Sequence, residues 1–398
     1  MSSLNDPIRE GLQRGWKVFG GARAALPAKI TCDVAIIGSG AGAGISAELL
    51  AKAGLSVVII EEGPLNSSPD FNQKENEAYP SLYQESAGRK TKDKAITILQ
   101  GRSVGGSTTV NWTSSFRTPA GTLQYWQDHF GLSDYNPQAL AAYFAQAETR
   151  LNIEPWPTPP NENNDILRRG ASKLGISSDA MKRNVRGCYN LGSCGMGCPT
   201  NAKQSMLVTT IPAALDQGAT LLVETRAHKF DIANGRINSL QCVAVKPNAA
   251  VLDNQQSATQ IVAKHFVLAG GAINSPALLL RSQAPDPQHH LGTRTFLHPV
   301  SIATAVMAQA VNPWDGAPQS IYSDHFLGTQ AIDGPIGFKI EVAPLHPVFF
   351  GANLPGFGTS QAALFREYPR VNLLLALMRD GFHAQSVGGK VELRDDGS

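Results

Sequence analysis

Long hydrophobic segments and an excess of one charge are both missing from this sequence. No run of eighteen or more apolar residues occurs, so we expect no membrane span. The 34 Lys and Arg residues nearly balance the 32 Asp and Glu residues, which gives no indication of nucleic acid or of an anionic membrane as a partner. The N-terminus carries no apolar segment of the secretory type, and this favours a cytoplasmic, reducing compartment.

Internal repeats and low-complexity segments are also absent, and cysteine is scarce, with five residues in a chain of 398. Hydrophobic residues make up 42% of the chain and charged residues 17%, as in ordinary globular proteins. The length predicts two or three domains and is ample for a large core.

The clearest structural pattern is a strand, a helix and a second strand within residues 32–62. Residues 34–37 form a short apolar run that is typical of a buried parallel strand. A glycine cluster and a helical run over 43–53 follow, and residues 57–60 form a second apolar strand. This order predicts one βαβ unit.

The stretch "GSGAGA" between these elements matches a dinucleotide-binding motif. Gly38 permits the tight turn, Gly40 allows the backbone to approach a diphosphate, and Ala43 takes the small position where helix and strand pack. The diphosphate would lie on backbone N–H groups at the start of the helix. Glu61, at the end of the second strand, can accept hydrogen bonds from ribose hydroxyls and would repel a 2′-phosphate, which argues against NADP. The motif itself does not separate NAD from FAD.

Local signals predict several further elements. Asn136 and Pro137 begin a helix, and another helix is expected to end at Gly175. Asn234-Gly235 predicts a hairpin turn between two strands. Alternating apolar residues in "GGKVELRDDGS" predict a final strand, and Asp396-Gly397 predicts a turn after it. Because no return strand follows, we expect the sequence to be an N-terminal part of a longer protein.

A second glycine cluster, "GRSVGGSTTVNWTSSFRTP", occupies residues 101–119. Gly105 and Gly106 expose bare backbone beside the small polar side chains of Ser107 and Asn111, an arrangement that suits a flat polar ring. A polar turn without a ligand is an equally good interpretation of this stretch taken alone.

With the cluster in its context, the sequence resembles the glucose–methanol–choline (GMC) oxidoreductases, which are FAD-dependent enzymes that oxidise alcohols. Residues 101–119 resemble their first signature, "LAGGAINSPALLLRS" resembles the second, and His298-Pro299 resembles a step that follows. The similarity runs from Cys32 onward. "GCPTNAKQS" resembles a bacterial-type subgroup whose relatives include long-chain alcohol oxidases and FAD sugar dehydrogenases.

The resemblance implies an α/β fold, with a Rossmann-type FAD-binding domain and an interleaved α+β substrate domain whose C-terminal part is missing. Residues 1–31 would be an N-terminal extension. The FAD-binding domain would comprise 32–120 and 206–285, interrupted by a helical, cysteine-containing insertion over 121–205. Residues 286–398 would be an incomplete substrate domain.

Cofactor contacts are implied at ten positions. The first glycine motif would meet the FAD diphosphate, Glu61 the ribose, the second cluster the flavin, Ala227 the adenine, and Gly270 would close over the diphosphate. The full set is Gly38, Gly40, Ala43, Glu61, Gly105, Gly106, Ser107, Asn111, Ala227 and Gly270. Ala43 departs from close relatives, which carry glycine there, and its methyl could crowd the helix–strand contact.

The implied reaction is oxidation of the CH–OH group of an alcohol by hydride transfer to FAD. Oxygen, a quinone or a cytochrome would then take the electrons. The family's catalytic histidine and its histidine or asparagine partner are expected downstream of Ser398, so no catalytic residue is assigned here. His298 fits a structural position better than a catalytic one. A non-catalytic, flavin-binding remnant is the alternative from another functional class.

Three cysteines, Cys188, Cys194 and Cys198, lie within eleven residues, in the spacing C-x5-C-x3-C-P. Thiolates at short spacing with a following proline occur at iron–sulfur clusters. The spacing also resembles the cluster-binding loop of the FAD sugar dehydrogenases, so an iron–sulfur-containing dehydrogenase is a second possible enzyme. A Cys194–Cys198 disulfide and plain loop thiols remain open alternatives, whereas zinc lacks a fourth nearby ligand.

Overall fold

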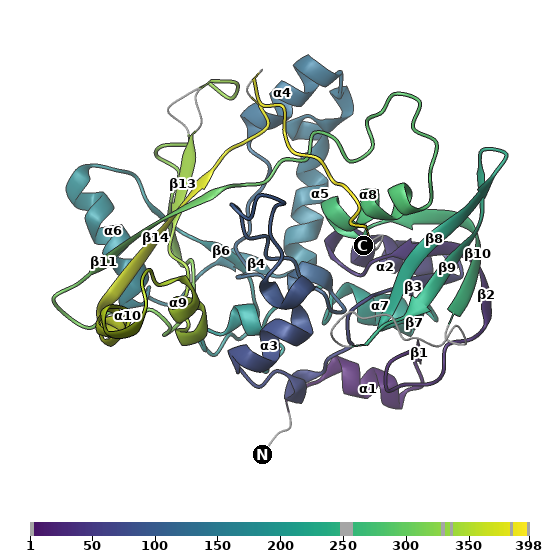
Figure 1. Ribbon diagram of the computed structural model, residues 1–398, viewed down its shortest axis with the longest axis horizontal. Coiled ribbons are helices and arrows are strands. Elements are labelled where there is room, and N and C mark those ends of the chain that lie inside the picture. The colour runs from purple at the N-terminus through teal and green to yellow at the C-terminus, as the bar shows by residue number, and fades with distance from the viewer. Residues whose placement is uncertain (1–3, 247–257, 328–330, 335–336, 383–384, 396–398) are drawn as a thin grey trace. The chain divides into compact units, whose positions relative to one another are not determined.

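The computed structural model describes residues 4–246, 258–327, 331–334, 337–382 and 385–395 (Figure 1). The chain forms two compact units. The first unit comprises residues 1–111, 195–295 and 388–398, and the second comprises 112–194 and 296–387. The second unit is thus inserted between segments of the first.

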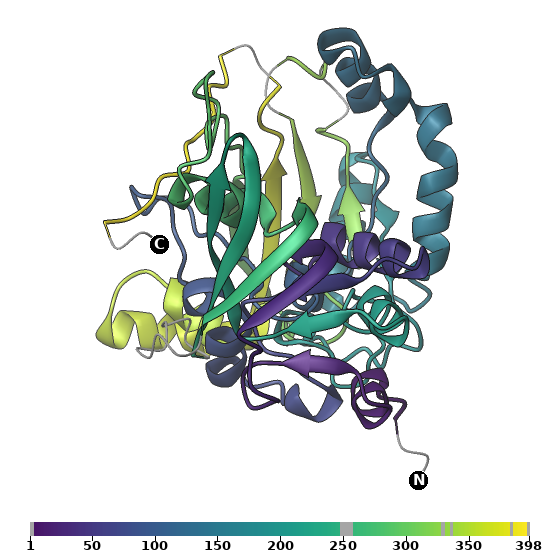
Figure 2. The same ribbon diagram turned by 90° about the vertical axis from the view of Figure 1, so that its right-hand side faces the viewer.

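The first unit is built on a seven-stranded sheet with the order β1-β7-β3-β2-β10-β9-β8. Its strands are β1 Lys17–Phe19, β7 Thr220–Leu222, β3 Val57–Ile60, β2 Lys29–Ile37, β10 Ala258–Leu268, β9 Arg236–Ala244 and β8 Thr225–Ala233. The strands from β1 to β10 pair in parallel, whereas β10, β9 and β8 pair antiparallel. The long strands β8, β9, β10 and β2 run beside one another (Figure 1 and Figure 2).

The βαβ unit predicted near the N-terminus is confirmed, because β2 and β3 pair in parallel and are joined by helix α2, Ala41–Lys52. All four residues of β3 are buried, as expected for a central parallel strand. The other helices of this unit are α1 Pro7–Gln13, α3 Glu75–Leu82, α7 Thr210–Asp216 and α8 Gly271–Arg281. The mixed α/β class with a parallel sheet is therefore confirmed.

The second unit has a five-stranded antiparallel sheet with the order β11-β14-β13-β12-β5, and a separate pair, β4 and β6. The strands are β11 Val300–Val306, β14 Val371–Met378, β13 Phe338–Glu341, β12 Ile321–Ser323, β5 Asp179–Ala180, β4 Ile153–Pro155 and β6 Lys182–Asn184. Its helices are α4 Ala120–Phe130, α5 Pro137–Arg150, α6 Glu162–Leu174, α9 Pro347–Asn353 and α10 Gly358–Arg366. Leu167 of α6 packs with Ile321 and Val342, so this helix covers part of the sheet.

Local capping and turn signals are confirmed at three places. Asn136 caps α5 by accepting a hydrogen bond from the Ala139 N–H, and α6 ends at Gly175 in the left-handed conformation. Residues 234–235 separate β8 from β9. In contrast, the strand expected after Gly389 is not formed over 390–395, and the turn at 396–397 lies outside the described residues.

The boundaries of the two units differ from the predicted domain segments at four places. Residues 112–120 belong to the second unit rather than to the first, and residues 195–205, 286–295 and 388–398 belong to the first unit. The cysteine-containing stretch therefore divides between Cys194 and Gly195. Within the described ranges no helix combines the length and the apolar character needed to cross a membrane.

Candidate functional site

The first glycine loop lies where β2 leads into α2. Gly38 has a φ of +100°, and a Cβ at this position would lie 2.4 Å from the carbonyl oxygen of Ala269. The same Cβ would lie 3.2 Å from the Cα of Gly270, which precedes α8. Glycine is thus required at position 38 both by backbone conformation and by the close approach of the loop before α8.

Helix α2 begins at this loop with Gly40 as its N-cap, and no side chain of the described residues accepts hydrogen bonds there. The first N–H groups of the helix are therefore available to an anionic ligand. Ala43 is fully buried in the first turn, so its methyl is accommodated. The tight packing position is instead Gly44, whose Cβ would lie 2.4 Å from Thr210 Oγ1 in α7.

The second glycine loop touches the first. Gly106 has a φ of +55°, and a Cβ there would lie 2.7 Å from the Cα of Gly40. Gly105 is also left-handed, with a φ of +89°. The structure therefore brings together the two glycine clusters, which are separated by more than sixty residues in the sequence.

Ser39, between the two glycines of the first motif, connects three parts of the site. Its hydroxyl accepts a hydrogen bond of 3.0 Å from the Gly105 N–H and donates one to the Glu61 carboxylate. The other carboxylate oxygen accepts from the Gly63 N–H at 2.8 Å. Ser39 is fully buried. Ser39 was not among the residues predicted for the site, although a polar side chain between two motif glycines was the available signal.

Glu61 follows β3 and is buried. Desolvation of its carboxylate raises the pKa to about 7, while the hydrogen bonds from Ser39 and Gly63 act in the opposite direction. Glu61 therefore changes its charge close to neutral pH.

The buried guanidinium of Arg102 lies near the carboxylates of Glu61 and Glu62. Arg102 is 1% exposed, and its Nη1 donates to the carbonyl oxygen of Glu62 at 3.3 Å. Its Nη2 is buried and has no hydrogen-bond partner among the residues that the structure describes. A buried, unmatched donor is costly, and a bound group rich in acceptor oxygens would supply the missing partner.

The far end of the second glycine loop carries Ser107 and Asn111. Ser107 Oγ accepts a 3.0 Å hydrogen bond from the Gly101 N–H, and the Asn111 N–H donates to the Ser107 carbonyl at 2.8 Å. Both residues are exposed within the structure. Small polar side chains beside bare glycine backbone are therefore accessible to a ligand here.

Ala227 lies near the start of β8. The Thr225 N–H donates to the Glu61 carbonyl at 3.0 Å, so β8 begins at the end of β3. One residue before Ala227, Arg226 forms a 3.1 Å ion pair with Glu62. The main chain expected to meet the adenine thus lies next to the carboxylate expected to meet the ribose.

These features fit a bound dinucleotide of the FAD type. They comprise an uncapped helix start, glycine contacts that leave no room for side chains, a buried carboxylate and a buried donor without a partner. Bound FAD would be held by Gly38, Gly40, Glu61 and the second glycine loop, with Gly270 beside Gly38.

The structure does not support the predicted iron–sulfur site. None of the five cysteines forms a disulfide, and no group of three or more His, Cys, Asp or Glu side chains suited to a metal occurs in the described part of the chain. Each candidate thiol has its own local partner instead. Cys188 Sγ accepts from the Asn190 N–H, Cys194 Sγ from Arg183 Nη2, and Cys198 Sγ from the Lys203 N–H, at 3.4, 3.5 and 3.4 Å.

The structure does not support the disulfide alternative either, because Cys194 and Cys198 are not joined by a disulfide. The spacing of the cysteines in the sequence does not determine how the backbone runs between them. In the structure, Cys198 belongs to the first unit, whereas Cys188 and Cys194 belong to the second.

Comparison with known proteins gives relatives over most of the chain. A long-chain-alcohol oxidase of Arabidopsis thaliana is 29% identical over 378 residues, which cover 92% of this chain and 49% of the plant protein. An uncharacterised GMC-type oxidoreductase of Sinorhizobium fredii is 30% identical over 345 residues, covering 85% of this chain and 64% of that protein. The chain thus spans about half the length of the plant oxidase.

Two solved structures share the fold. Pyridoxine 4-oxidase of Mesorbium loti has a TM-score of 0.62 at 17% identity, covering 87% of this chain and 71% of that chain. A variant of formate oxidase from Aspergillus oryzae RIB40 has a TM-score of 0.61 at 13% identity, covering 88% and 73%. A sequence model described as GMC oxidoreductase matches residues 79–300. Because this match covers more than half of the chain, the chain belongs to the GMC oxidoreductase family.

Proposed function

We propose that this chain binds FAD and serves an enzyme that oxidises the CH–OH group of an alcohol. The observation that carries the proposal is the contact between the two glycine loops, where Gly106 lies against Gly40 with no space for a side chain. Packing alone would not require an uncapped start of α2, and it would not leave the buried Arg102 Nη2 without a partner among the described residues.

Each part of the site has a task in holding the cofactor. The N–H groups at the start of α2 would bind the diphosphate, since the helix dipole favours negative charge there. Glu61 would accept hydrogen bonds from ribose hydroxyls and exclude a 2′-phosphate. Ser107 and Asn111 would hold polar edges of the ring. When bound, FAD supplies the hydride acceptor for alcohol oxidation.

The substrate and the electron acceptor are proposed from the relatives. The Arabidopsis relative is named a long-chain-alcohol oxidase, so we take a long-chain primary alcohol as the substrate and oxygen as the acceptor. A quinone or a cytochrome is the competing acceptor.

Flavin analysis tests the first half of the proposal. Protein expressed from its complete gene should show flavin absorbance in the visible and near-ultraviolet range. The chromophore released by heat should be FAD by chromatography and mass. Purified protein that neither retains FAD nor takes it up during titration would overturn the proposal.

Substrate reduction under anaerobic conditions tests the second half. We expect 1-dodecanol to bleach the flavin absorbance and glucose to leave it unchanged. Admitting oxygen should restore the absorbance and produce hydrogen peroxide. Restoration by a quinone but not by oxygen would reject the proposed acceptor and leave the FAD assignment intact.

A further inference from the structure

The main chain after the last clustered cysteine packs against the second glycine loop. We call residues 198–207 the anchoring segment and residues 105–111 the flavin-side loop. The Met206 N–H donates to Thr108 Oγ1 at 3.1 Å, and a Cβ at Gly105 would lie 2.9 Å from the Leu207 nitrogen. Both segments belong to the first unit. They are in direct contact although about a hundred residues separate them.

Lys203 provides the strongest of these contacts. Its side chain is buried, at 3% exposed, and its ammonium donates to the carbonyl oxygens of Thr109 and Asn111 at 2.8 and 2.7 Å. Hydrogen bonds from a charged donor are about twice as strong as neutral ones. A buried ammonium is costly to desolvate, so its placement against two main-chain oxygens implies a role that a smaller apolar residue would not provide.

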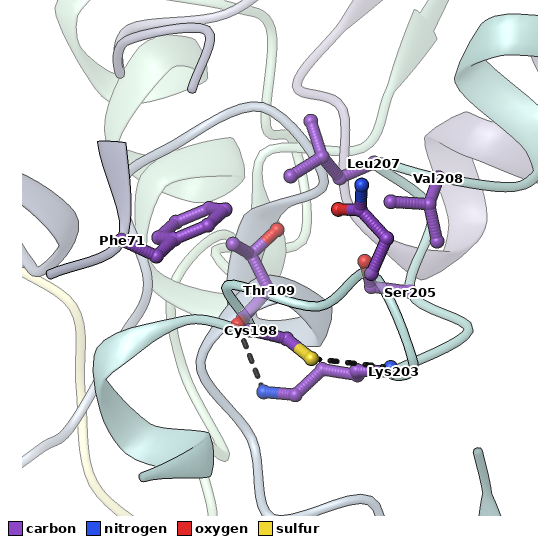
Figure 3. Close-up of a pocket in the computed structure, with 8 residues that line it drawn as sticks. Phe71, Thr109, Cys198, Lys203, Ser205, Leu207 and Val208 are labelled. Atoms are coloured by element: carbon purple, nitrogen blue, oxygen red, sulfur yellow. Dashed lines mark hydrogen bonds between the residues drawn. The ribbon is translucent and has the colours of Figure 1, made fainter. Parts of the chain in front are cut away.

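Lys203 lines a small hollow (Figure 3). The hollow beside it has a volume of about 10 Å³, which is room for one water molecule and not for a ligand. Phe71, Cys198 and Leu207 are among the residues that line it. Cys198 Sγ accepts the Lys203 N–H, so this cysteine holds the main chain from which the lysine side chain extends.

We propose that Lys203 is a positioning residue for the cofactor: it fixes the Thr109 and Asn111 carbonyls and so the backbone that presents Ser107 and Asn111 to the flavin. This inference rests on the proposed FAD binding. The ammonium is also a fixed positive charge beside the flavin-side loop, and positive charge favours the electron-rich state of a nearby group. Its loss should therefore make the reduction potential of bound FAD more negative.

The test compares K203M, which removes both donors and the charge, with K203Q, which keeps N–H donors without the charge. K264M is the matched control, because Lys264 lies in the same unit with 75% of its side chain exposed and pairs only on the surface with Asp33. Hydrogen exchange of residues 105–111 is measured in the apoprotein. FAD affinity is measured by fluorescence titration, and the reduction potential by dye equilibration.

For K203M we expect faster exchange in the flavin-side loop and FAD affinity lower by about ten- to a hundredfold. K203Q should show a smaller loss of affinity. Both variants should have a more negative potential than the wild type, and K264M should match the wild type in all three measurements. If K203M does not fold, K203Q carries the test.

Chemical rescue separates the charge from packing. K203A leaves space for a small molecule, and n-propylammonium should restore FAD affinity toward that of the wild type. 1-Propanol, which has a similar shape without the charge, should not. Rescue by both compounds would reduce Lys203 to a space-filling residue and overturn the inference.

Two further results discriminate between the inference and the function on which it rests. Wild-type exchange, affinity and potential in K203M would overturn the role of Lys203 while FAD binding stands. A wild-type protein that takes up no FAD would overturn the proposed function. Even in that case, exchange in the apoprotein still reports whether Lys203 orders the flavin-side loop.

Discussion

Ser39 holds Glu61 and the second glycine loop in one hydrogen-bonded arrangement, since its buried hydroxyl donates to the Glu61 carboxylate and accepts from the Gly105 N–H. The side chain expected to bind the ribose is thereby tied to the loop expected to bind the flavin. The distance along the sequence hides this relationship, because Ser39 and Gly105 are 66 positions apart.

The first prediction concerns Ser39→Ala. It leaves a buried carboxylate oxygen and a buried N–H without their partner, which costs about 1–3 kcal/mol. We expect FAD affinity to fall by about tenfold or more in fluorescence titrations. Ser46→Ala in α2 is the matched control, because the Ser46 hydroxyl forms only an exposed 2.8 Å hydrogen bond, which it donates to the Gly42 carbonyl, among the contacts of the described residues. Equal FAD affinity in the two variants would show that Ser39 does not contribute to the cofactor site.

The second prediction concerns pH and Glu61. Burial raises the pKa of this carboxyl from 4.5 to about 7, so the folded chain binds the proton more tightly than the unfolded chain. Its contribution to stability is therefore complete below pH 4.5 and is lost as the pH rises through about 7. The loss is on the order of 3 kcal/mol.

Glu61→Gln should remove that part of the pH dependence. The measurement is the urea unfolding of apoprotein at pH 5 and pH 8, and the difference between the two pH values should be smaller in the variant. Glu341→Gln is measured in the same way for comparison. Burial raises the pKa of Glu341 to about 7 in the second unit, so this variant should also show a smaller difference in stability between the two pH values. Identical pH profiles for wild type and Glu61→Gln would contradict the assignment.

The third prediction concerns the contact of the two loops. Gly106→Ala introduces a Cβ at 2.7 Å from the Gly40 Cα, at a φ of +55° that disfavours alanine. We expect a lower melting temperature of the apoprotein and FAD affinity reduced by at least about tenfold. Gly170→Ala, where the described residues leave open space around a helical position, should be neutral or stabilising. Full FAD binding by Gly106→Ala would show that the loops do not need to touch.

The fourth prediction concerns the clustered cysteines. Protein purified without oxygen should contain neither iron nor acid-labile sulfide, because no group of three or more His, Cys, Asp or Glu side chains suited to a metal occurs among the described residues. Cys188→Ala and Cys194→Ala should keep the flavin spectrum of the wild type. Stoichiometric iron in the wild type that is lost in both variants would contradict this prediction and support an iron–sulfur cluster.

Sequence reasoning succeeded where the signal is local. Apolar runs and glycine spacing predicted β2, α2 and β3, because turn chemistry and periodicity depend on neighbouring residues. It also marked both glycine clusters, although it could not state that Gly40 and Gly106 touch.

It failed where the partners are distant in the chain. The role of Lys203 depends on carbonyl oxygens 92 and 94 residues away, which no spacing rule reveals. The cysteine spacing predicted an iron–sulfur cluster that the structure does not support. Such spacing describes which ligands are available and does not describe how the backbone turns between them.

The insertion of the second unit has a consequence for how the protein forms. Strand β2 pairs with β10, so Val34 meets His265 across more than two hundred residues. During synthesis the apolar β3 stays without its neighbour β7, and β2 stays without its neighbour β10, until these later strands have been made. Such non-local pairing slows folding and exposes strand edges to aggregation. Chaperone dependence during expression should therefore be strongest while the inserted residues 112–194 are being translated.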